Sequence, residues 1–150
     1  MGIIHDWKTV YLNPAAVELF GAKKQDELLG KHIYELIHPD FHELAIDNAK
    51  LLAEKGYVVM QEQKYIKLDG TILDVEAQAK SIRFNDNVAT LVVMNDITER
   101  KQAEQLIQDK SEEIAAQNEE LNQANIELIA AKEKAEESEE RYRGLLTNLE

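Results

Sequence analysis

The positions of glycine and proline limit what this chain can fold into, because both residue types end helices and form turns. The first half of the sequence is punctuated by Pro14, Gly21, Gly30, Pro39, Gly56 and Gly70. Neither residue type occurs again until Gly144. The sequence therefore predicts a turn-rich domain followed by one long, uninterrupted element, with the change near Asp96.

The region after Asp96 repeats with a period of seven. Its first repeat position, a, is mostly apolar, and its fourth position, d, is small or polar and includes Lys110 and Gln117. Sustained heptads predict a coiled coil, and about 48 helical residues would extend roughly 70 Å. We expect the seam to contain Ile107, Ile114, Leu121, Ala124, Leu128, Ala131, Ala135 and Tyr142. The d positions carry few apolar side chains. The alternative is therefore an amphipathic linker helix, which pairs only when the domains at its ends hold it in place.

The first region reads as short, alternating elements. Two short strands flank the turn "HDWK", and helices are expected after Asn13, near 24–30 and over 41–55. Asp69-Gly70 is a strong hairpin signal. After it, Leu73, Val75, Ala77 and Ala79 alternate with polar residues, which indicates one buried face. Three strands joined by hairpins, with two at the start, predict an α+β domain with an antiparallel sheet.

Charge and composition exclude several classes of partner. The formal net charge of -12 argues against nucleic acid and against contact with an anionic membrane surface. No run approaches the roughly 18 apolar residues that span a bilayer. The absence of cysteine removes thiolate catalysis and cysteine metal sites, and fits a reducing compartment. We expect a cytoplasmic protein.

Four stretches carry a family likeness: "YLNPAAVELFG", "DELLGKHIYELIHPDF", "YIKLDGTILDVEAQA" and "NDITERKQAE". In this order and spacing the chain resembles a PAS domain, the sensor module of many histidine kinases. The resemblance implies a five-stranded antiparallel sheet with helices on one face, here followed by a long C-terminal coiled-coil helix. We expect a PAS sensor domain over 1–97, a linker helix over 98–146, and the start of a following domain over 147–150.

The segment Asp96-Ile97-Thr98 matches the C-terminal junction of that family. Asp96 or Thr98 can cap the following helix by accepting from its free N–H groups, and Glu99 adds a favourable charge near the positive helix end. Such a cap would join the last strand to the helix rigidly, with no flexible loop between them. The plainer interpretation is an N-cap that only stabilises the helix, by ~1 kcal/mol.

A small-molecule pocket is the default site for such a fold. Its candidate lining residues lie on the inner sheet face and the long helix, although they could equally pack a closed core: Ile37, Phe41, Leu44, Tyr57, Val75, Ala77 and Val92.

We expect no metal, haem or flavin. His38 and His42 are separated by Pro39, the family's haem-ligand region "LLAEKGYVV" contains no His, and no cysteine could form a flavin adduct. We expect His38 to lie in a turn that caps the long helix through Asp40.

These observations favour a sensory and dimerisation module of a two-component signalling receptor. A change in the PAS core would pass through Asp96-Ile97-Thr98 into a parallel, homodimeric coiled coil that leads to further domains of the same receptor. The alternative is a ligand-free structural spacer or protein-interaction module. No catalytic residue set is present, and the phosphoacceptor and ATP-binding motifs of a histidine kinase are absent from the sequence, so we expect no enzyme activity.

Overall fold

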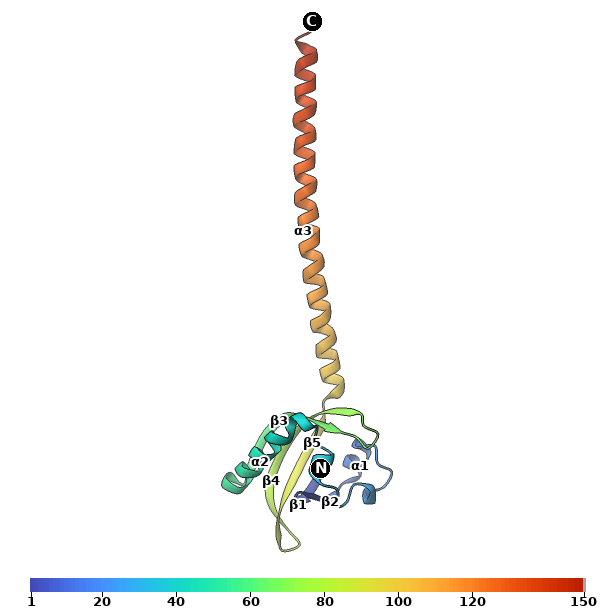
Figure 1. The fold of residues 1–150 in the computed structure, drawn as a ribbon, viewed down its shortest axis with the longest axis vertical. Coiled ribbons are helices and arrows are strands. Elements are labelled where there is room, and N and C mark those ends of the chain that lie inside the picture. Colours follow the sequence, from blue (N-terminus) through green and yellow to red (C-terminus); the bar gives the residue numbers. More distant parts are fainter. Residues whose placement is uncertain (150) are drawn as a thin grey trace. The chain divides into compact units, whose positions relative to one another are not determined.

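The computed structural model describes residues 1–149. Five strands form one antiparallel sheet with the spatial order β2-β1-β5-β4-β3, and Figure 1 shows the helices α1 and α2 beside it. The elements are β1 (Gly2–His5), β2 (Lys8–Leu12), α1 (Pro14–Leu19), α2 (His42–Lys55), β3 (Tyr57–Ile66), β4 (Ile72–Phe84), β5 (Asn87–Asp96) and α3 (Thr98–Thr147). Three short 3-10 helices, Gln25–Glu27, Ile33–Glu35 and Pro39–Phe41, connect α1 to α2.

Local sequence signals explain where the short helices begin and end. Asn13 caps α1, since its Oδ1 accepts from the Ala16 N–H at 3.1 Å, and Pro14 occupies the first turn. Gly56 ends α2 in the left-handed conformation, with φ of 77°. The expected cap through Asp40 is wrong. His38 Nδ1 instead accepts from the Asp40 N–H at 3.4 Å, and no side chain caps α2.

The core lies on one face of the sheet, where the helical segments cover it. Leu73, Val75 and Ala77 of β4 are each at most 3% exposed, as the alternating pattern predicted. They pack with the core side chains of the other elements: Leu12, Ala16, Phe20, Leu28, Ile33, Leu36, Ile37, Ala45, Tyr65 and Val92. The predicted α+β fold, with a five-stranded antiparallel sheet and helices on one face, is confirmed.

The chain divides into two compact units, residues 1–102 and 103–150. The first holds the sheet, its helices and the first turn of α3. The second contains the rest of α3, which ends at Thr147. The helix has 50 residues in all, and none of its described side chains is buried. Of the expected start of a following domain at 147–150, Glu150 lies outside the described residues. No helix of residues 1–149 has the length and apolar character needed to cross a bilayer.

Candidate functional site

A cavity of about 260 Å³ lies in the first unit, between the inner sheet face, α2 and the β1–β2 turn. Helix α2 contributes Ala45, Asn48, Ala49 and Leu52, which follow one another at helical spacing. The remaining walls are formed by β1 and the turn, by Ile33 and Ile37, and by strands β3, β4 and β5. The cavity is partly open to solvent.

Alanines create the open volume. Ala45 and Ala49 line it from α2, and Ala77 and Ala79 from β4. Ala45 and Ala77 are each less than a tenth exposed, so they are interior positions, where larger apolar side chains are common. Because the cavity is partly open to solvent, water can enter it.

Uncharged polar groups line the cavity wall. Asn48 Nδ2 donates to Gln61 Oε1 at 3.2 Å, whereas Asn48 Oδ1 is covered and has no hydrogen-bond partner among the described residues. Gln63 and Tyr65 are buried beside the cavity. Burial raises the pKa of Tyr65 from its ordinary value of 10.0 to about 12.

The β1–β2 turn places Trp7 at the cavity wall in a conformation that side chains rarely adopt. Asp6 and Trp7 have φ of 47° and 61°, which is the backbone of a type I′ turn. The Trp7 indole stacks against the His32 ring with 6.2 Å between centroids and lies 5.6 Å from the Tyr34 ring. Aromatic packing therefore fixes its orientation.

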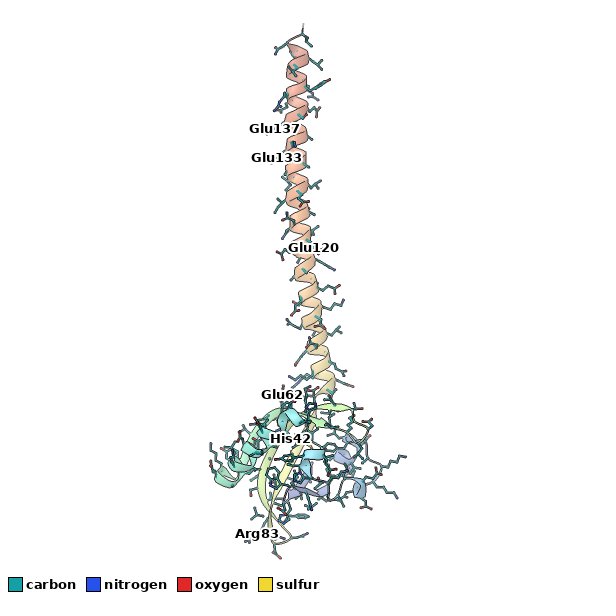
Figure 2. The ribbon with its side chains drawn as sticks, in the orientation of Figure 1. His42, Glu62, Arg83, Glu120, Glu133 and Glu137 are labelled. Carbon is teal, nitrogen blue, oxygen red and sulfur yellow. The ribbon has the colours of Figure 1, made fainter. Side chains whose placement is uncertain are left out.

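The histidines are engaged with the backbone of their own domain. His42, labelled in Figure 2, places Nε2 at 2.9 Å from the Ile37 carbonyl oxygen and 3.2 Å from that of Tyr34. His5 Nδ1 lies 2.9 Å from the Val88 carbonyl oxygen. His32 Nδ1 accepts from the Tyr34 N–H at 3.3 Å. Within residues 1–149 no three His, Cys, Asp or Glu side chains gather as metal ligands would.

Of the seven residues expected to line a pocket, only some line the cavity. Ile37, Ala77 and Val92 line the cavity, and Val75 is fully buried in the adjoining core. Phe41 packs against the core, Leu44 is half-buried, and neither lines the cavity. Tyr57 is 53% exposed at the start of β3 and does not line the cavity.

The second part of the candidate site is the junction between β5 and α3. Asp96 Oδ1 accepts from the Thr98 N–H at 2.9 Å, which is the expected capping contact. Thr98 Oγ1 accepts from the Asp74 N–H at 3.1 Å, and the Ile97 N–H donates to the Asp74 carbonyl oxygen at 2.9 Å. The side chain of Ile97 is only 3% exposed. The helix start is therefore bonded to β4 as well as to the strand that precedes it.

Ion pairs tie the first turn of α3 to the sheet. Arg100 Nη2 lies 3.1 Å from Glu62 Oε1 and 3.7 Å from Glu76 Oε1, and Lys101 pairs with Glu62. The hydrogen bond from Lys101 lowers the pKa of the Glu62 carboxyl, and the charges of Lys101 and Arg100 act in the same direction. Figure 2 shows Glu62 at the end of the sheet where α3 begins.

Sequence reasoning missed this ion-pair cluster, although a signal for it exists. The Asp69-Gly70 hairpin sets a register in which Glu62 pairs directly with Glu76. Like charges directly opposite each other on paired strands are destabilising, so a cation between them was to be expected. Arg100, one turn into the following helix, supplies that cation.

The residues of the predicted heptad seam are exposed in the described part of the second unit. Ile107, Ile114, Leu121, Leu128 and Tyr142 are each more than half exposed. Ala124, Ala131 and Ala135 are exposed as well. Glu120, Glu133 and Glu137, labelled in Figure 2, project from the helix between these positions.

Comparison with known proteins places this geometry in a family. The profile described as "PAS fold" matches residues 3–97. Sporulation kinase A of Bacillus subtilis (strain 168) is 34% identical over 106 residues, which cover 70% of this chain but only 17% of the kinase. The chain thus spans about a sixth of the length of this curated relative.

Solved structures agree on the fold. The PAS domain of a two-component sensor histidine kinase superimposes with a TM-score of 0.53 at 16% identity, covering 63% of this chain and 81% of that one. The PAS domain of nitrogen regulation protein NR(II) from Vibrio parahaemolyticus gives a TM-score of 0.53 at 22% identity, with 64% and 86% covered.

Proposed function

The chain belongs to the PAS family, and on that premise we propose that it is a sensory and dimerisation module of a histidine-kinase-type receptor. A signal-transduction role follows from the family and from the relationship to a kinase. The proposal adds the path by which the signal would reach the next domain. A change in the PAS core passes through Asp96, Ile97 and Thr98 into α3, and α3 pairs with a second copy as a parallel coiled coil.

The observation that carries the relay is the position of Thr98. Its backbone N–H is held by Asp96 and its hydroxyl by the backbone of Asp74, so two strands hold the first residue of α3. Ile97 is buried and bonded to the same residue of β4. A shift of β4 against β5 therefore moves the helix start, because no flexible segment intervenes to absorb the shift.

Pairing of α3 with a second copy is supported by its uncovered seam. An isolated helix gains little from propensity alone and needs an apolar contact to be stable. In a parallel pair, the a-position residues Ile114 and Leu121 would pack against their own counterparts. Glu127 would face Lys132 of the other helix, and Lys134 would face Glu139, each pair contributing ~0.2–1 kcal/mol.

We assign no catalytic step to this chain. The matched region is a PAS domain, and the chain spans a sixth of the related kinase, so phosphotransfer would reside in other domains of the same receptor. We further propose that the module works in the cytoplasm and carries no haem, flavin or metal. The backbone contacts of His5, His32 and His42 support that assignment, because those rings serve the fold.

Sedimentation equilibrium of the purified chain tests the dimer. We expect a dimer whose dissociation constant rises at least tenfold in Leu121→Lys, because this a position would bury a charge in the seam. Glu119→Lys, an outer position of the same helix, is the matched control and should leave the dissociation constant within about twofold. A monomeric chain, or equal effects of both substitutions, would remove the coiled-coil part of the proposal.

A further inference from the structure

We propose that the middle of α3 carries a second interaction surface, on the side of the helix opposite the predicted heptad seam, and that it binds a basic amphipathic helix of another protein. We call this surface the outer face, and it consists of one apolar cluster and three acidic side chains: Ile126, Ile129, Ala130, Glu119, Glu133 and Glu137. The inference rests on the proposed coiled coil, because pairing along the seam leaves the outer face uncovered.

The heptad places the apolar cluster outside the seam. Leu121 and Leu128 occupy successive a positions. Ile126 therefore occupies position f, and Ile129 and Ala130 occupy positions b and c, which point away from the partner in a two-stranded coiled coil. At about 100° per residue, Ile126 lies about 140° around the helix from Leu121. Its side chain is 62% exposed and that of Ile129 is 58% exposed, so both are as open to solvent as the seam.

The spacing of the cluster is that of an anchor for a second helix. Ile126, Ile129 and Ala130 are related as i, i+3 and i+4, so their side chains adjoin on one face. An amphipathic helix is recognised through side chains at this spacing. Isoleucine also has a lower helix propensity than the glutamate and glutamine that are common in this helix. A contact that removes both isoleucines from water therefore explains them better than the needs of the isolated helix do.

The charge of the outer face selects a basic partner. Glu119 and Glu133 lie seven residues before and after Ile126, which is two turns away on the same face. Glu137, labelled with Glu133 in Figure 2, follows it by four residues and adjoins it. Within residues 1–149, the ion pairs of the second unit involve other glutamates and leave these three carboxylates unpaired.

The sequence around the cluster supplies no positive charge of its own. No lysine or arginine occurs between Lys110 and Lys132. A partner helix with lysine or arginine beside its apolar stripe would provide the missing counter-charges. Exposed ion pairs of this kind contribute more to the choice of partner and to the rate of association than to affinity.

The same charge excludes a second copy of this chain as the occupant. If two outer faces met in parallel, each glutamate would oppose its own counterpart. If they met antiparallel about the middle of the apolar cluster, Glu119 of one copy would oppose Glu137 of the other. Like charges placed together disfavour such a contact. Nucleic acid and anionic lipid are excluded for the same reason.

The test measures binding of a designed probe to the full chain by fluorescence anisotropy. The probe is a fluorescein-labelled helical peptide with leucine at i, i+3, i+4 and i+7 and with lysine beside this stripe. One control peptide has glutamate in place of each lysine, and the other has the same composition in an order without a stripe. We expect saturable binding of the probe and at least tenfold weaker binding of each control. No saturable binding of the probe, or equal binding of the reordered peptide, would overturn the inference.

Variants of the apolar positions locate the binding. The double substitution Ile126→Gln and Ile129→Gln removes the cluster and should weaken probe binding at least tenfold, while glutamine preserves the helix. Leu121→Gln, in the seam, is the matched control, measured at a concentration where sedimentation shows the association state of the parent. It should bind the probe within about twofold of the parent. Weakening by the seam variant alone, or equally by both, would mean that the probe pairs with the seam, and would contradict the inference.

Variants of the acidic positions test the charge. In about 0.15 M salt, Glu133→Gln with Glu137→Gln should weaken probe binding about fivefold. Glu120→Gln with Glu127→Gln changes the net charge equally on another side of the helix and should leave the affinity within about twofold. Equal effects of the two double variants would mean that only net charge attracts the probe, and would contradict the assigned surface.

Sedimentation of the same samples separates this inference from the proposed function. A dimer without binding that depends on Ile126 and Ile129 would retain the coiled coil and lose the outer face. A monomer that binds the probe through these two residues would retain the outer face and lose the coiled coil. A parent tetramer that becomes a dimer when both isoleucines are replaced by glutamine would mean that a second copy covers the outer face, and would overturn the inference.

Discussion

Thr98 and Asp74 are 24 residues apart in sequence, yet the Thr98 hydroxyl oxygen accepts the Asp74 backbone N–H at 3.1 Å. This bond connects the first residue of α3 to β4, a strand that does not adjoin it in the chain. The same residue of β4 accepts from the Ile97 N–H. The sheet and the helix start therefore form one bonded unit.

Removal of the Thr98 hydroxyl should weaken this unit. In Thr98→Val the Asp74 N–H loses its partner, and we expect a loss of about 1 kcal/mol in the free energy of unfolding of the PAS domain. This corresponds to a fall in Tm of roughly 4 to 8 °C. Thr98→Ser keeps the oxygen and is the control. Equal melting of the valine and serine variants would show that the bond contributes nothing.

The ion pairs of Glu62 should make the junction sensitive to acid. The folded pKa of Glu62 lies below its ordinary value of 4.5. Its contribution to stability is therefore fully present above pH 4.5 and is lost as the pH falls through the lower, folded value. We expect Tm of the parent to fall more steeply than Tm of Glu62→Gln as the pH decreases from 5 to 3. Parallel curves for the two proteins would contradict this assignment.

The Tyr65 phenol should titrate after the other tyrosines. Its pKa is raised to about 12 by burial, so the stability that comes from its neutral form is complete below pH 10 and is lost as the pH rises towards 12. The absorbance change at 295 nm between pH 8 and 11 should therefore be the same in the parent and in Tyr65→Phe. A smaller change in the variant would show that Tyr65 ionises with the others.

Those parts of the fold that depend on local signals were predictable. The Asp69-Gly70 hairpin, the Asn13 cap and the alternation of β4 each depend on residues close together in sequence, and the structure has them as expected. The Asp96 cap is of the same kind. The bond from Thr98 to Asp74 was not predictable, because it depends on the register between β4 and β5.

The cavity illustrates the same limit. The apolar face of α2 is broad, so its sequence did not decide which side faces the sheet. Ala45, Asn48 and Ala49 line the cavity, whereas Leu44 does not. Tyr57 precedes an irregularity of register between Val58 and Gln61 in β3, and it pairs with Lys80 on the solvent side. One position along a helix or strand changes the direction of a side chain, and only tertiary packing fixes that phase.

The heptad phase of α3 should govern signalling in the full receptor. A deletion of seven residues between Ile107 and Leu128 keeps the seam aligned and should preserve regulation. A deletion of three or four residues rotates the output by about 40 to 60° and moves the heptad seam out of register, so it should invert or abolish regulation. The measurement is receptor output with and without stimulus for each deletion. Regulation that is indifferent to phase would mean that the helix is a passive spacer.

Site-specific crosslinking tests the central claim, a parallel coiled coil, most directly, because the chain contains no cysteine. Ile114→Cys at an a position and Ala131→Cys at a d position lie equally far from the middle of α3, and Glu119→Cys on the outer face is the control. We predict that each seam variant forms a disulfide-linked dimer on its own under mild oxidation, because like positions face each other in a parallel pair, while Glu119→Cys does not. Crosslinking only when the two seam variants are mixed would show an antiparallel pair, in which a faces d. Equal crosslinking at all three positions, or at none, would contradict a specific coiled coil.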